Sequence, residues 1–336
     1  MRLRLQQILV VTVLASFLAA CGGSPQIDRK TKLKRQIDAN YNVAVNRFGQ
    51  LTQSLKNGTM TNAIILKSYQ KSALKKKPEH KDIINVLASE GTINGPTYVS
   101  IKERLAEASK LIPTSLNSIE SSSNLNREFL NISAASQDYD AMLVDAINVL
   151  ADFTGGDLPK LRELEYEGES ASTEPAGSEY VGNSNYGHWK QGSNGQSFWV
   201  FYGQYAMFSS LYSRPVYYDH WSTHRRPSYY HDYGRDRYSS PAGRTNSSET
   251  LSRTKKNYSS QGKSFKSTYA KSKPTIKGAA KGTKPAFKSQ YASSRSSSSS
   301  TSSRSSNSSY RSSSSSRGSS YNSRSSGSSR SSSRGK

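Results

Sequence analysis

The sequence predicts a mainly α-helical protein that continues into an aromatic-rich module and a long basic tail. Apolar residues recur at spacings of three and four between residues 28 and 165, which indicates amphipathic helices. From residue 180 to 238, 17 of 59 side chains are Phe, Trp or Tyr. From residue 251 to the end, 19 side chains are basic and none is acidic, so this region carries most of the net charge of +23.

Five stretches of the chain carry a helical pattern. The first has Leu33, Ile37 and Tyr41 spaced four apart, which places them on one face. The expected helices cover residues 28–55, 61–76, 79–89, 98–112 and 115–153. Short connections between amphipathic helices are typical of an antiparallel helical bundle or of helical hairpins.

Gly and Pro predict where these helices stop. We expect ends at Asn57-Gly58, before Pro78 and at Gly155-Gly156. The polar run 121–124 is expected to break the fifth helix near its start.

The helical region offers little chemistry. Its acidic and basic side chains are balanced and scattered, as on solvated helix faces, and His80 is its one histidine. The sequence contains no phosphate-binding loop, zinc helix motif or nucleophile elbow, so we expect no enzyme activity, cofactor or metal. Residues 166–179, rich in Glu, Gly, Ser and Pro, are predicted to form an acidic linker.

The aromatic-rich module, residues 180–240, contains the candidate interaction residues, and its structure is left open. Trp189, Trp199 and Trp221 are the three tryptophans of the chain. The apolar run 197–208 suits a buried strand, an interfacial aromatic patch or a partner-binding segment, and it is too short to span a bilayer.

His220 and His224 are also candidate interaction residues. Their spacing of four would put both imidazoles on one face of a helix, although Pro215, Pro227 and Gly234 argue against a helix here. A metal-dependent enzyme could use this pair with Asp219, His231 and Asp232 as ligands. The alternative, which we favour, is that these rings stack and donate hydrogen bonds at an interface.

The first two dozen residues have the organisation of an export signal. Arg2 and Arg4 precede an apolar stretch over residues 8–18, which is too short for a stable membrane span. The segment Leu18-Ala19-Ala20-Cys21 resembles the lipobox of bacterial lipoproteins.

This resemblance implies cleavage after residue 20 and lipidation, including palmitate-type acyl chains, at Cys21, the one cysteine of the chain. Several acyl chains anchor a protein far more firmly than one. Residues 21–27 would then form a lipidated tether. Gly22 stands where an inner-membrane retention signal usually has Asp, so the outer membrane is favoured over the inner membrane.

The tail, predicted to run from residue 241 to 336, is expected to be disordered. Between residues 293 and 336, 28 of 44 side chains are Ser. The apolar residues of this stretch are Tyr310 and Tyr321, too few to form a packed core. Spaced Lys and Arg bind polyanions through counterion release. Because an exported protein does not meet cytosolic nucleic acid, the candidate partners are lipopolysaccharide, anionic lipid, acidic wall polymer and extracellular DNA. The remaining alternative is a simple spacer.

These observations together predict a membrane-anchored envelope lipoprotein with a non-enzymatic structural or binding role. An accessory factor that docks on an envelope protein complex through the aromatic block is the alternative.

Overall fold

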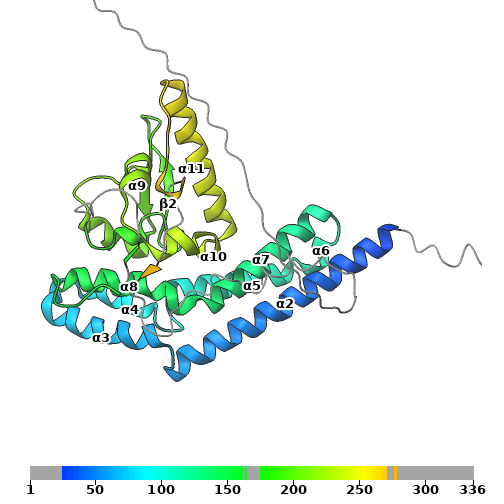
Figure 1. The fold of residues 1–336 in the computed structure, drawn as a ribbon, viewed down its shortest axis with the longest axis horizontal. Coiled ribbons are helices and arrows are strands. Elements are labelled where there is room, and N and C mark those ends of the chain that lie inside the picture. Colours follow the sequence, from blue (N-terminus) through cyan, green and yellow to red (C-terminus); the bar gives the residue numbers. More distant parts are fainter. Residues whose placement is uncertain (1–24, 162, 165–174, 271–275, 278–336) are drawn as a thin grey trace, which may run out of the picture. The chain divides into compact units, whose positions relative to one another are not determined.

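Helices form where the sequence repeats apolar residues every three or four positions (Figure 1). The structure is a computed structural model that describes residues 25–161, 163–164, 175–270 and 276–277. Its first seven helices are α2 (Pro25–Asn57), α3 (Thr61–Lys76), α4 (Lys81–Ser89), α5 (Pro96–Lys110), α6 (Ile112–Ser115), α7 (Ile119–Gln137) and α8 (Tyr139–Phe153). The prediction of a mainly helical fold is therefore confirmed.

The helix ends predicted from Gly and Pro are confirmed. Gly58 has a φ of +64°, and the amide of Thr59 donates a 3.1 Å hydrogen bond to the carbonyl of Ser54, which satisfies the end of α2. α3 ends two residues before Pro78, and α8 ends just before Gly155, whose φ is +68°. These helix ends depend on the backbone properties of Gly and Pro themselves, so the local sequence is enough to predict them.

The expected single helix over residues 115–153 is wrong. Its polar run 121–124 does not break a helix but lies in the first turns of α7, because the Ser118 hydroxyl accepts the amide of Ser121 and caps the helix at 3.0 Å. The helix is interrupted instead just before this run, at residues 116–118 between α6 and α7, and again at Asp138, between α7 and α8. There the carboxylate pairs with Arg237, a partner 99 positions away that the local sequence could not reveal.

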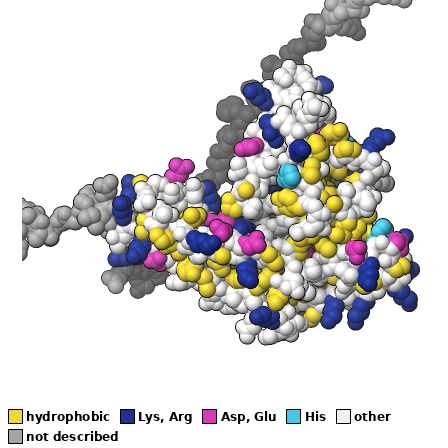
Figure 2. All heavy atoms as spheres, turned by 180° about the vertical axis from the view of Figure 1, so that it is seen from behind, with side chains coloured by type: hydrophobic (Ala, Val, Ile, Leu, Met, Phe, Trp, Pro, Cys, Tyr) yellow, Lys and Arg dark blue, Asp and Glu magenta, His cyan; other side chains and the backbone are white. Residues whose placement is uncertain are grey.

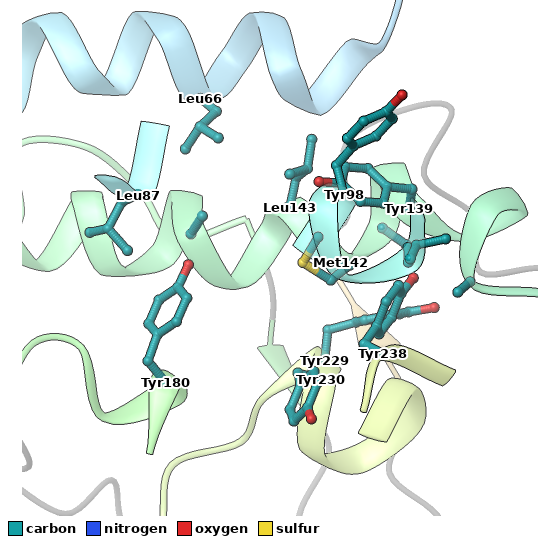
Figure 3. Packing of buried hydrophobic residues seen from close by; sticks show 14 of the residues in the cluster. Leu66, Leu87, Tyr98, Tyr139, Met142, Leu143, Tyr180, Tyr229, Tyr230 and Tyr238 are labelled. Carbon is teal, nitrogen blue, oxygen red and sulfur yellow. The ribbon is translucent and has the colours of Figure 1, made fainter. Parts of the chain in front are cut away.

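Helix α8 forms the centre of the hydrophobic core. It packs along α3, while α2 packs along α7. Figure 3 shows Leu66 on one side of α8, and Tyr180, Tyr229 and Tyr230 on the other. Because both sides are covered, nearly every side chain of α8 is buried, which matches a helix that is apolar almost all round.

The aromatic-rich module is built on a two-stranded antiparallel hairpin. β2 (Gly187–Gln191) pairs with β3 (Ser197–Phe201), and Gly195 supplies the positive φ of +76° that the connecting turn requires. The elements around it are the 3₁₀ turns η2 (Ser178–Tyr180) and η3 (Gly203–Leu211), α9 (Tyr218–His224), the π-helical turn η4 (Tyr230–Gly234) and α10 (Arg235–Tyr238).

The tail does not begin at residue 241, so that predicted boundary is wrong. Residues Pro241–Ser260 form the helix α11, capped by the hydroxyl of Ser240, and the 3₁₀ turn η5 follows at Thr268–Ala270. The two-residue strands β1 (Glu163–Leu164) and β4 (Ile276–Lys277) then pair in antiparallel fashion. The Ser/Arg-rich part of the predicted tail lies outside the described residues.

The predicted helical domain and the aromatic-rich module share one hydrophobic core. Tyr186, Tyr229 and Tyr238 of the module belong to the same cluster as Phe129 and Leu143 of the helices. Every described residue belongs to one compact unit. Among the described helices, none combines the length and apolar character needed to span a membrane.

Candidate functional site

The predicted lipidation residue, Cys21, lies outside the described residues, but the fold begins close to it in sequence. Helix α2 starts at Pro25, four positions later. Four residues span at most about 14 Å when fully extended. A lipid on Cys21 would therefore hold the start of α2 next to the membrane surface.

The three tryptophans lie together inside the aromatic-rich module. Trp189 and Trp199 face each other across the hairpin, with ring centroids 5.1 Å apart, and Trp221 of α9 packs 5.1 Å from Trp189. Their exposed fractions are 3, 7 and 3 %. In this fold the indoles stabilise the module, and any contact made by the module must use other side chains.

His220 and His224 are exposed and lie on one face of α9, as the spacing of four predicts. Their rings stack with centroids 4.8 Å apart. The two prolines that argued against a helix bound it instead, since α9 fits between Pro215 and Pro227, and Gly234 lies beyond it in η4. Nδ1 of His224 lies 2.7 Å from the hydroxyl of Thr223.

The other residues considered as metal ligands make separate contacts. Asp219 accepts a hydrogen bond from the Tyr258 hydroxyl at 3.1 Å, and Asp232 forms a buried ion pair with Arg225. His231 is buried, and burial, together with Arg225 and a second nearby arginine, holds its pKa well below the usual range. In the described part of the chain, no three His, Cys, Asp or Glu side chains form a group that could hold a metal ion.

Buried carboxylates connect the helices to the module, and sequence reasoning missed them. Asp145 of α8 accepts the hydroxyl of Ser228 at 2.6 Å and the amides of Tyr229 and Tyr230 at 2.8 Å each. An acidic residue within a helical pattern looks like part of a solvated face, and its partners lie more than 80 positions away. No local signal could have identified this contact.

Glu90 makes a second connection of this kind. It is fully buried, and its carboxylate accepts the amide and the hydroxyl of Thr97 at 3.1 and 3.0 Å. The Tyr186 hydroxyl of the module donates to the same group, and the Tyr139 hydroxyl donates to the Glu90 carbonyl at 2.9 Å. Burial raises the pKa of Glu90, and these hydrogen bonds oppose that rise.

A groove of about 1210 Å³ lies against α5, α6, α7 and the first turns of α11. Glu128 accepts Nε of Arg104 at 2.7 Å and an Nη of Arg244 at 2.6 Å. Burial alone would raise the pKa of Glu128, but the two guanidinium groups lower it. Hydroxyl and amide side chains make up much of the lining: Ser100, Thr114, Ser115, Asn117, Ser118, Ser121, Asn124, Asn131, Ser240 and Thr245.

The buried Glu179 predicts a measurable dependence of stability on pH. Burial raises its pKa to about 7, and the nearby Asp145 also raises it. The native state therefore keeps a proton that the unfolded chain releases near its usual pKa of 4.5. The protonated Glu179 makes its full contribution to the free energy of unfolding below about pH 4.5. This contribution falls by ~3 kcal/mol as the pH rises to about 7.

The substitution Glu179→Gln should flatten that fall and raise the free energy of unfolding at pH 8. Urea unfolding at several pH values would measure it, with the exposed Glu249→Gln as the matched control. Identical pH profiles for wild type and Glu179→Gln would contradict the prediction.

Comparison of the chain with protein-family models, with curated proteins and with solved structures yields no match.

Proposed function

We propose that this chain is a lipid-anchored, non-enzymatic protein of the bacterial cell envelope, with the outer membrane favoured, whose cationic tail contacts polyanions. The observation that carries the proposal is the lipobox-like segment ending at Cys21, four positions before the fold begins. An anchor so close to α2 would hold the helical body at the membrane surface.

The use of the buried polar groups supports a structural or binding role. Asp145, Glu90 and Glu128 each bind several donors from distant parts of the chain. Such contacts fix the helices against the module. They use the lone pairs that a general base would offer to a substrate.

The charge distribution supports contact with polyanions. Glu249 is the last acidic residue, and from Lys271 to the end the chain carries 14 basic side chains. This stretch follows η5, which ends at Ala270. Its partners are phosphate- or carboxylate-bearing envelope components such as lipopolysaccharide, anionic lipid or wall polymer.

The accessory-factor alternative is supported by the exposed rings of the module. His220 and His224 stack in solvent, and Tyr202, which is 39 % exposed, stacks on His188. Aromatic rings with polar edges suit an interface. Loss of a protein complex in a Tyr202→Ala, His220→Ala, His224→Ala variant that keeps its stability would favour this alternative.

The lipid anchor is tested with the variant Cys21→Ser, expressed in a bacterium that processes lipoproteins. The wild type should leave residues 1–20 behind, gain the mass of a diacylglyceryl group and an acyl chain, and stay with the membrane in high salt. Cys21→Ser should lose both the mass and the salt-resistant binding, whereas the control Ser24→Ala should keep them. An unmodified Cys21 in the mature wild type would refute the proposal.

The tail is tested by comparing the full chain with a chain that ends at Lys277. We expect the full chain to bind lipopolysaccharide and anionic vesicles far more tightly, with an affinity that falls steeply from 50 to 200 mM salt. The shortened chain, which keeps the exposed lysines and arginines of the fold, should bind far more weakly and keep the stability of the fold. Equal binding by both chains would show that the tail is a spacer.

A further inference from the structure

The first turns of α2 carry an exposed cluster of positive charge. Arg29, Lys30, Lys32, Lys34 and Arg35 are all exposed. Among the side chains of α2 that the structure describes, from residue 29 on, the first buried one is Ile37, so this part of the helix extends past the packed core. Figure 2 shows lysine and arginine side chains gathered where α2 begins.

Exposed apolar side chains lie at the same end of the helices. Asn40 of α2 donates a 3.1 Å hydrogen bond to Asn126 of α7, and Tyr41 packs 5.4 Å from Phe129, so the two helices run parallel. Both helices rise about 1.5 Å per residue. Ile119 lies seven positions before Asn126, and residue 33 lies seven positions before Asn40, so Ile119 is level with residue 33. Ile119 is 56 % exposed.

Leu111, at the junction of α5 and α6, is 55 % exposed and belongs to this end as well. Figure 1 shows α6 toward the same end of the helices as the start of α2. Of the acidic residues at this corner, Glu107 pairs with Lys110 at 2.9 Å and Glu120 is exposed. The five cations of α2 therefore keep the end positive.

We propose that this basic end, made of residues 29–35 with Leu111 and Ile119, lies on a lipid surface that carries anionic headgroups. The inference rests on the proposed function, because it is the lipid on Cys21 that would bring the basic end to the membrane. Pro25 lies within about 14 Å of Cys21, and residue 35 lies about 15 Å further along the helix. With this end of the helix lying along the membrane surface, the cations would be close to the headgroup phosphates.

The chemistry of the surface favours anionic lipid over zwitterionic lipid. Lys and Arg beside a negative leaflet are attracted to its phosphates over about one Debye length, and exposed Leu and Ile enter the boundary between headgroups and acyl chains. A lipid anchor combined with a basic patch holds a protein more firmly than either does alone.

A fluorescent label at the basic end tests the inference separately from the tail. In a Cys21→Ser background, Asn117→Cys supplies a single thiol at the corner, and Ser68→Cys supplies a matched exposed site on α3. Vesicles of phosphatidylglycerol and phosphatidylcholine are compared with vesicles of phosphatidylcholine alone. We expect the label at 117 to shift to the blue with the anionic vesicles, and the label at 68 to stay unchanged.

Charge variants complete the test. In a chain that ends at Lys277, which lacks the tail and keeps every described residue of the fold, replacing the five cations of the basic end by Gln should lower the vesicle affinity reported at position 117 by at least about 100-fold. The control replaces five exposed lysines elsewhere by Gln and should keep the shift: Lys67, Lys71, Lys75, Lys77 and Lys81.

Two results would overturn the inference: equal shifts at positions 117 and 68, or a full shift in the variant without the basic end. Failure of the lipid anchor is recognised separately, from the mass of the wild-type chain at Cys21. The vesicle assay does not depend on that mass, because its background has no cysteine at position 21.

Discussion

A chain that ends at Thr250 is expected to have a free energy of unfolding several kcal/mol below that of a chain that ends at Lys277. The removed residues include Phe265, which is 8 % exposed and belongs to the tryptophan cluster, and Tyr258, whose ring packs 5.0 Å from it. Burying one large side chain is worth roughly 1.5–3 kcal/mol.

Hydrogen bonds and charged contacts add to this loss. The Thr268 hydroxyl donates to the Ser222 carbonyl at 2.6 Å, and the Tyr258 hydroxyl donates to Asp219. The guanidinium groups of Arg225 and Arg235 lie 4.6 and 4.1 Å from the ring of Tyr269. Each such contact contributes about 1 kcal/mol, so we expect a total loss of about 4 kcal/mol or more.

Urea unfolding followed by circular dichroism compares the two chains, and near-ultraviolet signals report on the packing of the tryptophans. The chain ending at Lys277 should match the full chain within about 0.5 kcal/mol, because it keeps every packed residue described here. Equal stabilities for the chains ending at 250 and 277 would show that α11 and η5 do not stabilise the module.

This boundary shows what the sequence can and cannot predict. Residues 251–270 look like the tail because they are rich in Ser and Lys. Leu251, Tyr258 and Phe265 recur every seven residues, however, and all three pack on the tryptophan cluster. That spacing was the available signal, and composition averaged over the whole tail concealed it.

The helix ends predicted from Gly and Pro were confirmed, whereas the break predicted from the polar run 121–124 was wrong. Gly58 and Pro78 act within one helical turn, so the ends of α2 and α3 could be read directly. The helix break at Asp138 and the contacts of Asp145 depend on arginine, serine and tyrosine residues more than 80 positions away. Only the tertiary structure brings these groups together.

The tryptophans illustrate the same limit for the candidate site. An indole ring suits a protein interface and a hydrophobic core equally well, and the low exposed fraction of the three rings assigns them to the core. The position of His220 and His224 depends only on local geometry. Residues four apart lie on the same face of a helix, so their spacing predicts that the two rings are neighbours if α9 is helical, and it is.

Trp221→Ala should destabilise the protein by about 3–5 kcal/mol, because it removes a large buried side chain from a closely packed site. The Trp221 ring contacts Trp189 and His231, with centroids 5.1 and 4.9 Å away. The site has no room to adjust on one side, since a Cβ added to Gly182 would lie 2.7 Å from the indole. Urea unfolding measures this loss, and it is followed by far-ultraviolet circular dichroism because the substitution removes part of the tryptophan fluorescence.

Tyr202→Ala is the control for this substitution, since its ring is exposed and its loss should cost less than about 1 kcal/mol. A Trp221→Ala protein as stable as the control would refute a core role for the indole. If stability falls as expected, loss of partner binding in Trp221→Ala reports unfolding of the module. Docking must then be assigned from the exposed rings of Tyr202, His220 and His224, whose removal leaves the tryptophan cluster in place.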